Sequence, residues 1–500
     1  MSLLVVILLV SVATVISYAV LRTQTMAIRI QENADLRAAA RQAAVSGLTY
    51  GIHQMHSADW TGVDTSETRA IAGHERFTVS YAAGDPTLGP GDADYSDYPY
   101  RVAVTSTGYA EDPEDTSRVA SYSVRAVLRL IPRALSTWSD WPANHADWPT
   151  DWYKMDEYSV YQTKKEETKL DVPCQLAGNV RLQGKLNLAP NYPSAYNQYP
   201  FRYYMMGLKQ MVDKGYPDYR PISGDIWLPY SEQSLTYFYY LYYYLQFGRH
   251  DKAVDEVSSD WTNYDNLTTY QIYPGGPVYD IEAFSDANQT GANLGPDPLT
   301  NPLGLFYRDT NMTLQGNVAV NGTLFCHGDL SLQGTAQFTP VTLPSLYGSD
   351  KPVKLPTLTS HKLTVKPGSA TTIAGVTAVF DEFKVETSSV TLPFSIIGKL
   401  IAKKITVDKR QPWDTADWDD LVTTYRYEGT STTFPQWLVN YGYNPCPNIK
   451  VSPDSTPVLY HWNNWDAPIF VPHDDDDGGL RWALLRWQEG SDVGPIIMPE

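Results

Sequence analysis

The chain has 500 residues, of which 43% are hydrophobic, and this is enough to build two or three domains with real cores. Its formal net charge is −18, with 38 Lys and Arg against 56 Asp and Glu, and the absence of a basic patch argues against a nucleic-acid partner. Cys174, Cys326 and Cys446 lie far apart without CxxC spacing, so neither a zinc site nor a disulfide framework is indicated, although one pair can still bridge.

The first element in chain order is an uncharged apolar run from Ser2 to Leu21. At about 1.5 Å per residue, a helix of this length crosses a hydrocarbon core of about 30 Å. The run has no basic n-region and no small-residue cleavage motif follows it, which favours an anchor over a cleaved signal peptide. No proline occurs from Met1 to Met55, so one helix is expected over 1–55, apolar in its first half and amphipathic in its second.

The amphipathic half carries two ridges at i, i+4 spacing. One ridge is apolar and the other consists of small residues: Ala40, Ala44, Leu48 and Ile52, and Ala39, Ala43, Gly47 and Gly51. Three alternating segments follow, with Phe77, Val79 and Tyr81, then Tyr100, Val102 and Val104, then Tyr122, Val124, Ala126, Leu128 and Leu130. This alternation predicts an antiparallel sheet over 56–132 that packs against the helix.

These residues resemble a known family. The helix carries the pattern Asn33-x3-Arg37-x2-Ala40-x3-Ala44-x2-Gly47-Leu48, and the strands contain Ser106-Thr107-Gly108 and Arg125-Ala126-Val127-Leu128. The pattern is similar to type IV pilins and type II secretion pseudopilins, with the minor pilin of the PilX kind as the closest variant, over residues 1 to about 132. The resemblance implies a non-catalytic structural subunit whose helix packs first in a membrane and then against other pilin-like subunits.

The sequence departs from the family at the start of the helix. No basic leader ending in Gly precedes the apolar run, the fifth position of the run is not Glu, and Val45 stands where the family pattern has Glu. Arg22, Arg29, Arg37 and Arg41 all follow the span, which taken literally would place the bulk of the chain in the cytoplasm. If the start codon has been assigned too far downstream, so that a leader containing Lys or Arg is missing from the sequence, the predicted orientation is reversed. We expect that reversal, and hence a single-pass inner-membrane protein with its bulk periplasmic or extracellular.

The next segment, 133–175, has the composition of a Trp- and Pro-rich linker. Its aromatic residues Trp138, Trp141, Trp148 and Trp152 either anchor the linker or stack on sugar rings, so surface polysaccharide is a further partner to consider.

A six-residue period then dominates the sequence. Glycines recur at Gly316, Gly322, Gly328 and Gly334, and the units have the form x-G-x-Φ-x-Φ, where Φ is apolar. The same spacing occurs at 177–188 and, more loosely, at 397–407. Short repeats of this kind predict stacked strands, so we expect an irregular right-handed β-helix, or solenoid, over 176–408. Ordinary hairpin strands with coincident glycines are the alternative. The hexads also bear a weak resemblance to bactofilins.

Two further segments interrupt or follow the period. Residues 191–302 form an aromatic insertion, in which 203–216 and 235–248 are expected to be short helices. Residues 409–500 form an acidic carboxy-terminal region, in which 480–488, LRWALLRWQ, is expected to be an amphipathic helix that caps the end of the solenoid. The predicted fold class is therefore mainly β with a long amino-terminal helix.

No segment presents a convincing catalytic, cofactor or metal site. The run from His473 to Gly479 contains four consecutive Asp but lacks the ligand spacing of an EF-hand, so a solvated acidic loop is favoured over a calcium site. A second cluster combines acidic and aromatic residues: Trp413, Asp414, Asp417, Trp418, Asp419 and Asp420. A pair of catalytic carboxylates, as in a glycosidase, is the less favoured interpretation of this cluster. Asn-x-Thr sequons occur at Asn266, Asn288, Asn311 and Asn321.

The sequence therefore predicts a non-catalytic, membrane-anchored component of a type IV pilus or type II secretion-like assembly, without a cofactor. The alternatives are a surface β-helix that binds or cleaves polysaccharide and a bactofilin-like scaffold on the cytoplasmic face.

Overall fold

The computed structural model describes residues 2–57, 59–131, 158–170, 174–188, 224–229, 249–251, 268–343, 353–366, 369–386, 394–407, 449–453 and 481–490. The chain forms two compact units: the first comprises Met1–Ile131, Gln271–Pro277 and Pro468–Glu500, and the second comprises Pro132–Tyr270 and Val278–Ala467. The second unit is therefore inserted within the chain of the first.

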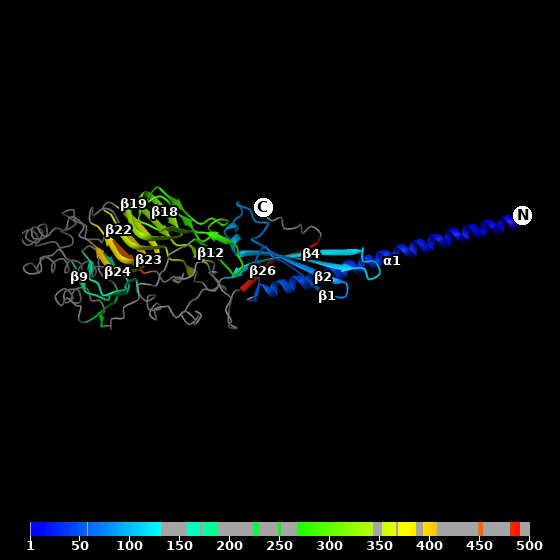
Figure 1. The fold of residues 1–500 in the computed structure, drawn as a ribbon, viewed down its shortest axis with the longest axis horizontal. Helices are drawn as coiled ribbons and strands as arrows, with labels where there is room; N and C mark the ends of the chain where they lie inside the picture. The colour runs from blue at the N-terminus through cyan, green and yellow to red at the C-terminus, as the bar shows by residue number, and fades with distance from the viewer. Residues whose placement is uncertain are drawn as a thin grey trace, which may run out of the picture. The chain divides into compact units, whose positions relative to one another are not determined.

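The first unit begins with α1, Ser2–Gln54, a single α-helix of 53 residues. The expected continuous helix is confirmed, because no proline interrupts its backbone hydrogen bonds and alanine is frequent in its second half. Figure 1 shows the first half of α1 extending beyond the sheet on which its second half lies.

The second half of α1 packs on an antiparallel sheet with strand order β1-β2-β3-β4-β26. Its strands are β1 Ser66–Ala72, β2 Glu75–Ala83, β3 Arg101–Glu111, β4 Val119–Ile131 and β26 Arg481–Glu489, and a short 3-10 helix, η1 Tyr95–Tyr100, precedes β3. Alternate residues of the strands, among them Phe77, Val79, Val104 and Leu128, are buried. The predicted meander and its apolar face are confirmed.

Strand β26 corrects one sequence prediction. Residues 480–488 were expected to form a helix, but Arg481–Glu489 instead pairs antiparallel with β4, from Ile131 to Val124. In the sequence, Leu480, Leu484 and Trp487 recur at i, i+4 and i+7, which is the spacing of one helical face, so local periodicity alone favours the wrong element. The pairing with β4 decides between helix and strand, because it satisfies the backbone groups of an otherwise open sheet edge.

The second unit is built mainly from parallel strands joined in one large sheet. In chain order these strands are β5 Val160–Gln162, β6 Thr168–Leu170, β7 Cys174–Leu176, β8 Val180–Arg181, β9 Leu186–Leu188, β10 Ile226–Leu228, β11 Arg249–Asp251, β14 Glu282–Ala283, β15 Asn288–Thr290, β16 Asn293–Leu294, β17 Leu305–Arg308, β18 Met312–Asn321, β19 Thr323–Thr339, β22 Leu358–Val365, β23 Ala370–Val385, β24 Phe394–Val407 and β25 Ile449–Ser452. Two smaller two-stranded sheets pair β12 Thr269–Gln271 with β13 Val278–Asp280, and β20 Thr342–Leu343 with β21 Val353–Lys354.

The register of β18 and β19 explains the six-residue period. Met312 pairs with Leu330 and Asn321 with Thr339, so that partners are 18 residues, or three hexads, apart. Gly316 therefore lies beside Gly334. The predicted apolar face is also confirmed, because all of its members are buried in one core: Val318, Val320, Leu324, Cys326, Leu330, Leu332 and Phe338. Parallel pairing to neighbouring strands excludes the alternative of hairpin strands for these hexads.

The four glycines of the hexads do not occupy equivalent positions, although an exact six-residue repeat would place all of them at equivalent corners. Gly316, Gly322 and Gly334 have positive φ values of 70°, 156° and 105°, but Gly328 does not adopt a left-handed conformation. At Gly328 the requirement is close packing instead, since a Cβ there would lie 2.4 Å from the backbone nitrogen of Asn311.

The order of the strands in space differs from their order in the sequence. One row of register partners runs through Leu324, Leu358, Thr377, Leu400, Val160, Val180 and Ile226. Strand β8, which belongs to the hexads at 177–188, therefore pairs with β5, and β5 pairs with β24. If the strands followed one another in space in chain order, these hexads would lie next to β18 instead. Strands β5 and β6 fall within the segment assigned to a linker, β10 and β11 within the segment assigned to an insertion, and β25 within the acidic carboxy-terminal region.

Candidate membrane and assembly interface

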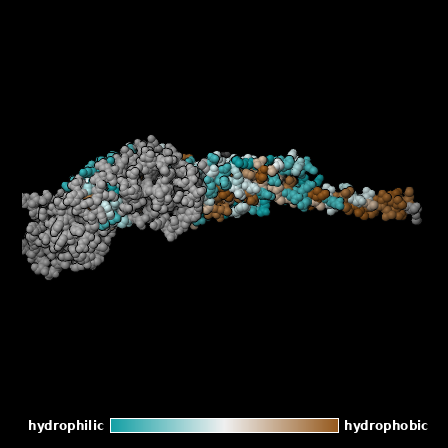
Figure 2. Space-filling view, turned by 90° about the horizontal axis from the view of Figure 1, so that it is seen from below, coloured by the Kyte–Doolittle hydropathy of each residue, from teal (hydrophilic) through white to brown (hydrophobic). Residues whose placement is uncertain are grey.

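The first half of α1 presents apolar side chains to the outside over its whole circumference. From Leu3 to Ile30 its large apolar residues are all exposed, and none of the most apolar window is buried within the protein. Figure 2 shows the hydrophobic residues gathered at the free end of the helix, with hydrophilic residues among them closer to the sheet. By length and composition the helix is able to cross a membrane, either as an anchor or as a signal sequence. The expected apolar half is therefore present as a free-standing helix.

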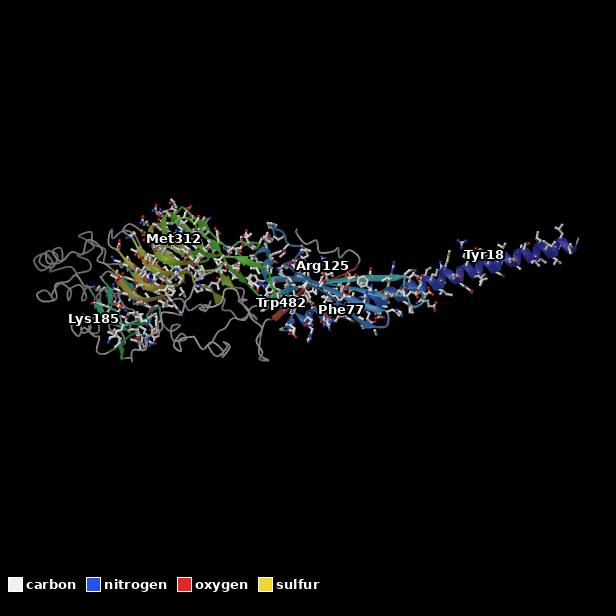
Figure 3. All side chains as sticks on the ribbon, in the orientation of Figure 1. Tyr18, Phe77, Arg125, Lys185, Met312 and Trp482 are labelled. Atoms are coloured by element: carbon white, nitrogen blue, oxygen red, sulfur yellow. The ribbon has the colours of Figure 1, made fainter. Side chains whose placement is uncertain are left out.

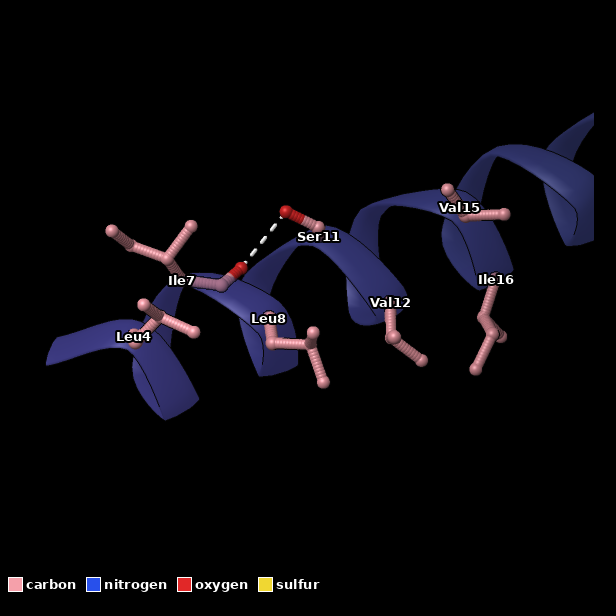
Figure 4. Close-up of a pocket in the computed structure, with 7 residues that line it drawn as sticks. All are labelled: Leu4, Ile7, Leu8, Ser11, Val12, Val15 and Ile16. Carbon is pink, nitrogen blue, oxygen red and sulfur yellow. Dashed lines mark hydrogen bonds between the residues drawn. The ribbon is translucent and has the colours of Figure 1, made fainter. Parts of the chain in front are cut away.

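Several hydroxyl groups within this half are satisfied by the helix itself. Ser11 Oγ donates to the carbonyl oxygen of Ile7 at 2.8 Å, as Figure 4 shows, and Thr14 Oγ1 donates to that of Val10 at 2.8 Å. Thr23 makes the same bond to Ala19 at 2.8 Å. A polar group facing hydrocarbon without a partner is costly, so these bonds suit an apolar environment.

A shallow apolar groove runs along one side of this helical segment. Its lining residues are Leu4, Ile7, Leu8, Ser11, Val12, Val15 and Ile16, as Figure 4 shows. All of them come from the same helix, and none carries a charge that would orient a polar ligand. Sites for small molecules usually combine an enclosed cavity with a few placed polar groups. The groove is therefore suited to lipid chains or to the ridge of another apolar helix.

The second half of α1 is held against the sheet along a seam of glycines. A Cβ on Gly47 would lie 2.3 Å from Ser106 Oγ and 2.6 Å from Phe77 Cγ, and a Cβ on Gly51 would lie 2.7 Å from Val79 Cγ1. On the sheet, a Cβ on Gly108 would lie 2.1 Å from the carbonyl oxygen of Ala40. Gly47 and Gly51, which belong to the ridge of small residues, therefore form a closely packed seam, and Gly108 is its counterpart on β3.

The two predicted ridges share this interface. Ala40, Ala43, Ala44 and Leu48 are fully buried, whereas Ala39 and Ile52 at the margins are half-buried. Figure 3 places Phe77 in the same unit, on the sheet that the second half of α1 covers. Tyr81 adds a polar contact, because its hydroxyl donates to the carbonyl oxygen of Gly51 at 3.2 Å and burial raises its pKa above the ordinary range.

Arg118, in the turn between β3 and β4, marks the point at which α1 leaves the sheet. Its guanidinium lies 2.6 Å from Asp112, 3.2 Å from Glu32 and 3.0 Å from the side-chain oxygen of Asn33. Further along the helix, Arg41 lies 2.8 Å from Glu489 on β26. Arg118 contacts α1 immediately after the exposed apolar residues end at Ile30. The helix is therefore divided at this point into a free segment and a docked segment.

An aromatic cluster joins three distant parts of the chain within the first unit. Trp60 stacks on Tyr273 with ring centroids 6.1 Å apart, and Trp482 meets both rings edge-on at 5.8 Å and 5.0 Å. The backbones of Gly62 and Gly275 touch beside it, leaving no room for a Cβ on either residue. The cluster explains why residues 271–277 and 481–489 belong to the first unit. Sequence reasoning missed it, because its members are hundreds of residues apart.

A buried ion network also fastens β26 to the first unit. Arg101 lies 3.2 Å from Asp85 and 3.3 Å from Asp97, Arg129 lies 3.0 Å from Asp97, and Arg486 contacts Asp85. Asp85 is only 1% exposed, so removal of either arginine would leave its charge poorly compensated. Burial lowers the pKa of the nearby Arg125 guanidinium, and the charge of Arg486 lowers it further.

Most of the residues considered for chemistry lie outside the described part of the chain. This applies to Trp138, Trp141, Trp148 and Trp152, to the run from His473 to Gly479, to the cluster from Trp413 to Asp420, and to Asn266, Cys446 and the expected helices at 203–216 and 235–248. Among the described residues, no group of three or more His, Cys, Asp or Glu side chains is placed to hold a metal ion. Cys326 is a buried free thiol, whereas Asn288, Asn311 and Asn321 are exposed.

No protein-family model matches the sequence, and no curated protein matches it. Among solved structures, the crystal structure of competence-associated pilin ComZ from Thermus thermophilus aligns with 91% of this chain and 98% of its own, at 11% sequence identity and a TM-score of 0.21. A TM-score this low does not establish a common fold, so function is inferred from the geometry of α1 and its sheet.

Proposed function

We propose that the protein is a non-catalytic, single-pass inner-membrane component of a type IV pilus or type II secretion-like assembly, similar to a minor pilin of the PilX kind. Its apolar helix first resides in the membrane and later packs against the helices of other pilin-like subunits. One observation carries the proposal: α1 continues without a break from a fully exposed apolar half into a half that is docked on an antiparallel sheet.

The physical basis is that one helix surface serves two environments. Lipid chains and neighbouring apolar helices are equally good partners for Leu, Ile and Val side chains, so transfer from membrane to filament needs no change in α1. The glycine seam around Gly47 and Gly108 keeps the docked half rigidly attached to the sheet. Movement of the free half therefore carries the rest of the chain with it, towards the periplasm or the cell surface.

The proposal assigns the parallel strands of the second unit to a right-handed β-helix displayed by this anchor. Support comes from the 18-residue spacing of register partners in β18 and β19 and from the single core that their alternate residues share. Crossover connections between parallel strands of one sheet are almost always right-handed. A stack of such coils forms a rigid rod-like surface and needs no catalytic group to act as a structural or adhesive element.

A photo-crosslinking amino acid at Val12, in the groove of α1, tests the assembly role in cells that make the full chain. We expect adducts with the helices of other pilin-like subunits when the assembly machinery is active and with lipid alone when it is absent. The same probe at Thr68, exposed on β1, serves as the control for non-specific capture. Lipid adducts alone under both conditions would contradict the assembly role and would show that α1 serves only as a membrane anchor.

The non-catalytic assignment has its own test. Purified full-length protein in detergent is expected not to cleave acidic or neutral polysaccharides, with or without Ca²⁺. Turnover that disappears when Asp414, Asp417 or Asp419 is changed to Asn would instead establish a polysaccharide-cleaving enzyme.

A further inference from the structure

Three Asn-x-Thr sequons lie on neighbouring strands of the second unit. They begin at Asn288 on β15, Asn311 just before β18, and Asn321 at the end of β18. Asn288 and Thr313 are register partners, so the first two sequons lie side by side on paired strands. All three asparagines are exposed, but their surroundings differ in ways that decide which one a transferase can use.

Asn288 has the most accessible surroundings. It belongs to a short edge strand whose described pairing is with β18 alone, and both Asn288 and Thr290 are exposed. Residues 285–287, which precede it, are exposed as well. Within the described residues, the Asn288 side chain makes no hydrogen bond. Its amide is therefore free to enter another active site, and the Thr290 hydroxyl is free to be recognised with it.

The other two sequons are engaged in the fold. The side-chain oxygen of Asn311 accepts a hydrogen bond from the backbone N–H of Asp329 at 2.8 Å. At the third sequon the threonine is inaccessible: Thr323 is 0% exposed, and its hydroxyl donates to the carbonyl oxygen of Pro356 at 2.5 Å. A transferase would have to pull the Asn311 amide away from the strand to which it is bonded, and at the third sequon it would have to break the Thr323 bond to reach the hydroxyl.

We propose that Asn288 is an N-glycosylation site and that Asn311 and Asn321 remain unmodified in the folded protein. In the transfer step, Asn288 Nδ2 attacks the anomeric carbon of a glycosyl diphosphate donor. A carbon–nitrogen bond forms as the bond between that carbon and the diphosphate oxygen breaks. The amide loses one proton to a base of the transferase, and the diphosphate leaves. Thr290 supplies the hydroxyl that the sequon requires at its third position.

A glycan at this place would also protect the edge of the parallel sheet. Strands β14, β15 and β16 each pair with one neighbour among the described strands, and their outer backbone groups form a template for further pairing. A bulky hydrophilic group on Asn288 would sterically hinder another strand from adding there. A glycan at Asn288 would therefore hinder association of two sheets through this open edge.

Peptide mass analysis of the full-length protein, isolated from the cells that naturally make it, tests the proposal. Cleavage before aspartate releases 286–296, whose only sequon begins at Asn288, and 309–328, whose two sequons begin at Asn311 and Asn321. We expect a glycan mass on the first peptide and none on the second. In Thr290→Val the added mass should disappear, whereas Thr290→Ser and Gln289→Ala should keep it.

An unmodified 286–296 peptide from the natural source overturns the proposal, and so does a glycan that persists in Thr290→Val. A glycan on 309–328 would show that the structural distinction between the sequons is wrong. These results are independent of the Val12 crosslinks, because those report on α1 and would stand whether or not Asn288 carries a sugar.

Discussion

At the scale of single residues, the glycine seam is the contact most sensitive to substitution. Gly47 has no space for even one additional carbon, because Ser106 and Phe77 already occupy the position of a Cβ. Gly47→Leu is therefore expected to destabilise the docking of α1 by about 1–3 kcal/mol, through overpacking. The loss should appear as a lower denaturant midpoint for the full chain in detergent.

The adjacent variant Ser46→Leu is the matched control, because Ser46 is exposed on the same helix turn. Membrane insertion should be unchanged in both variants, since 2–21 is intact. Equal denaturant midpoints for the two variants would show that close packing at Gly47 does not stabilise the docking of α1.

Cys326 provides a pH-dependent signal from inside the parallel sheet. Burial raises the pKa of its thiol to about 12, while an exposed thiol in the unfolded chain ionises near pH 8.5. The unfolded state therefore releases this proton at lower pH than the folded state does. Stability from the neutral buried thiol is fully present below about pH 8.5 and is lost progressively as pH rises towards 12.

Unfolding free energies of wild type and Cys326→Ala, measured from pH 7 to pH 11, check this. The wild type should lose stability faster than the variant above about pH 8.5. Parallel pH profiles would mean that the thiol is not protected by burial.

At the scale of elements, β26 offers a comparison between two tryptophans on one strand. Trp482 is 6% exposed within the aromatic cluster, whereas Trp487 is 43% exposed. Trp482→Ala should cost about 3–5 kcal/mol, because it leaves a cavity beside the stacked rings of Trp60 and Tyr273. Trp487→Ala should cost much less. Thermal unfolding and protease resistance of the carboxy-terminal strand measure both effects, and equal losses would contradict the cluster.

Within the parallel sheet, Leu330 and Ser331 form a similar pair. Leu330 is fully buried in the common core and Ser331 is half-buried on the opposite face. Leu330→Asp should unfold the sheet, since an unpaired charge in an apolar core costs several kcal/mol. Ser331→Asp should leave the circular dichroism spectrum and melting temperature nearly unchanged. Similar melting temperatures for the two variants would invalidate the assignment of faces.

The elements also show what sequence can predict. The continuous helix, the alternating strands of the antiparallel sheet and the buried residues of the hexads follow from local periodicity, and the structure confirms them. Local periodicity cannot predict which strands become neighbours when they are far apart in sequence. The pairing of β24 with β5, the aromatic contact of Trp60 with Tyr273, and the strand conformation of 481–489 all depend on partners supplied by distant segments.

At the scale of the whole molecule, the second unit is an insertion between β4 and β26. Ile131 and Arg481 are register partners, so the two ends of the inserted chain emerge beside each other. Replacement of 132–480 by a short hairpin turn should therefore leave a folded helix-and-sheet unit. Its stability should be reduced, because Trp60 and Trp482 lose the ring of Tyr273.

Circular dichroism and hydrogen exchange of this shortened protein in detergent provide the measurement. Protection of β2, β3 and β4 should persist. The matched control ends the chain at Ile131 without restoring β26, and its β4 should lose protection, since Trp482 and Arg486 are then absent. Loss of protection in both proteins would show that the first unit depends on the second for its folding.

The position of β26 after the whole inserted unit has a consequence for biosynthesis. The ribosome makes α1 before the other elements of the first unit, and it must pass through the whole inserted unit before it makes the strand that completes the first sheet. At rates of about 5–20 residues per second, the membrane helix is synthesised long before its sheet can close. Until then β4 is an open edge and Asp85 lacks Arg486. Completion of the antiparallel sheet thus waits for the synthesis of β26, so that a product truncated within 132–480 would carry a membrane helix without a finished platform and would be exposed to proteolysis.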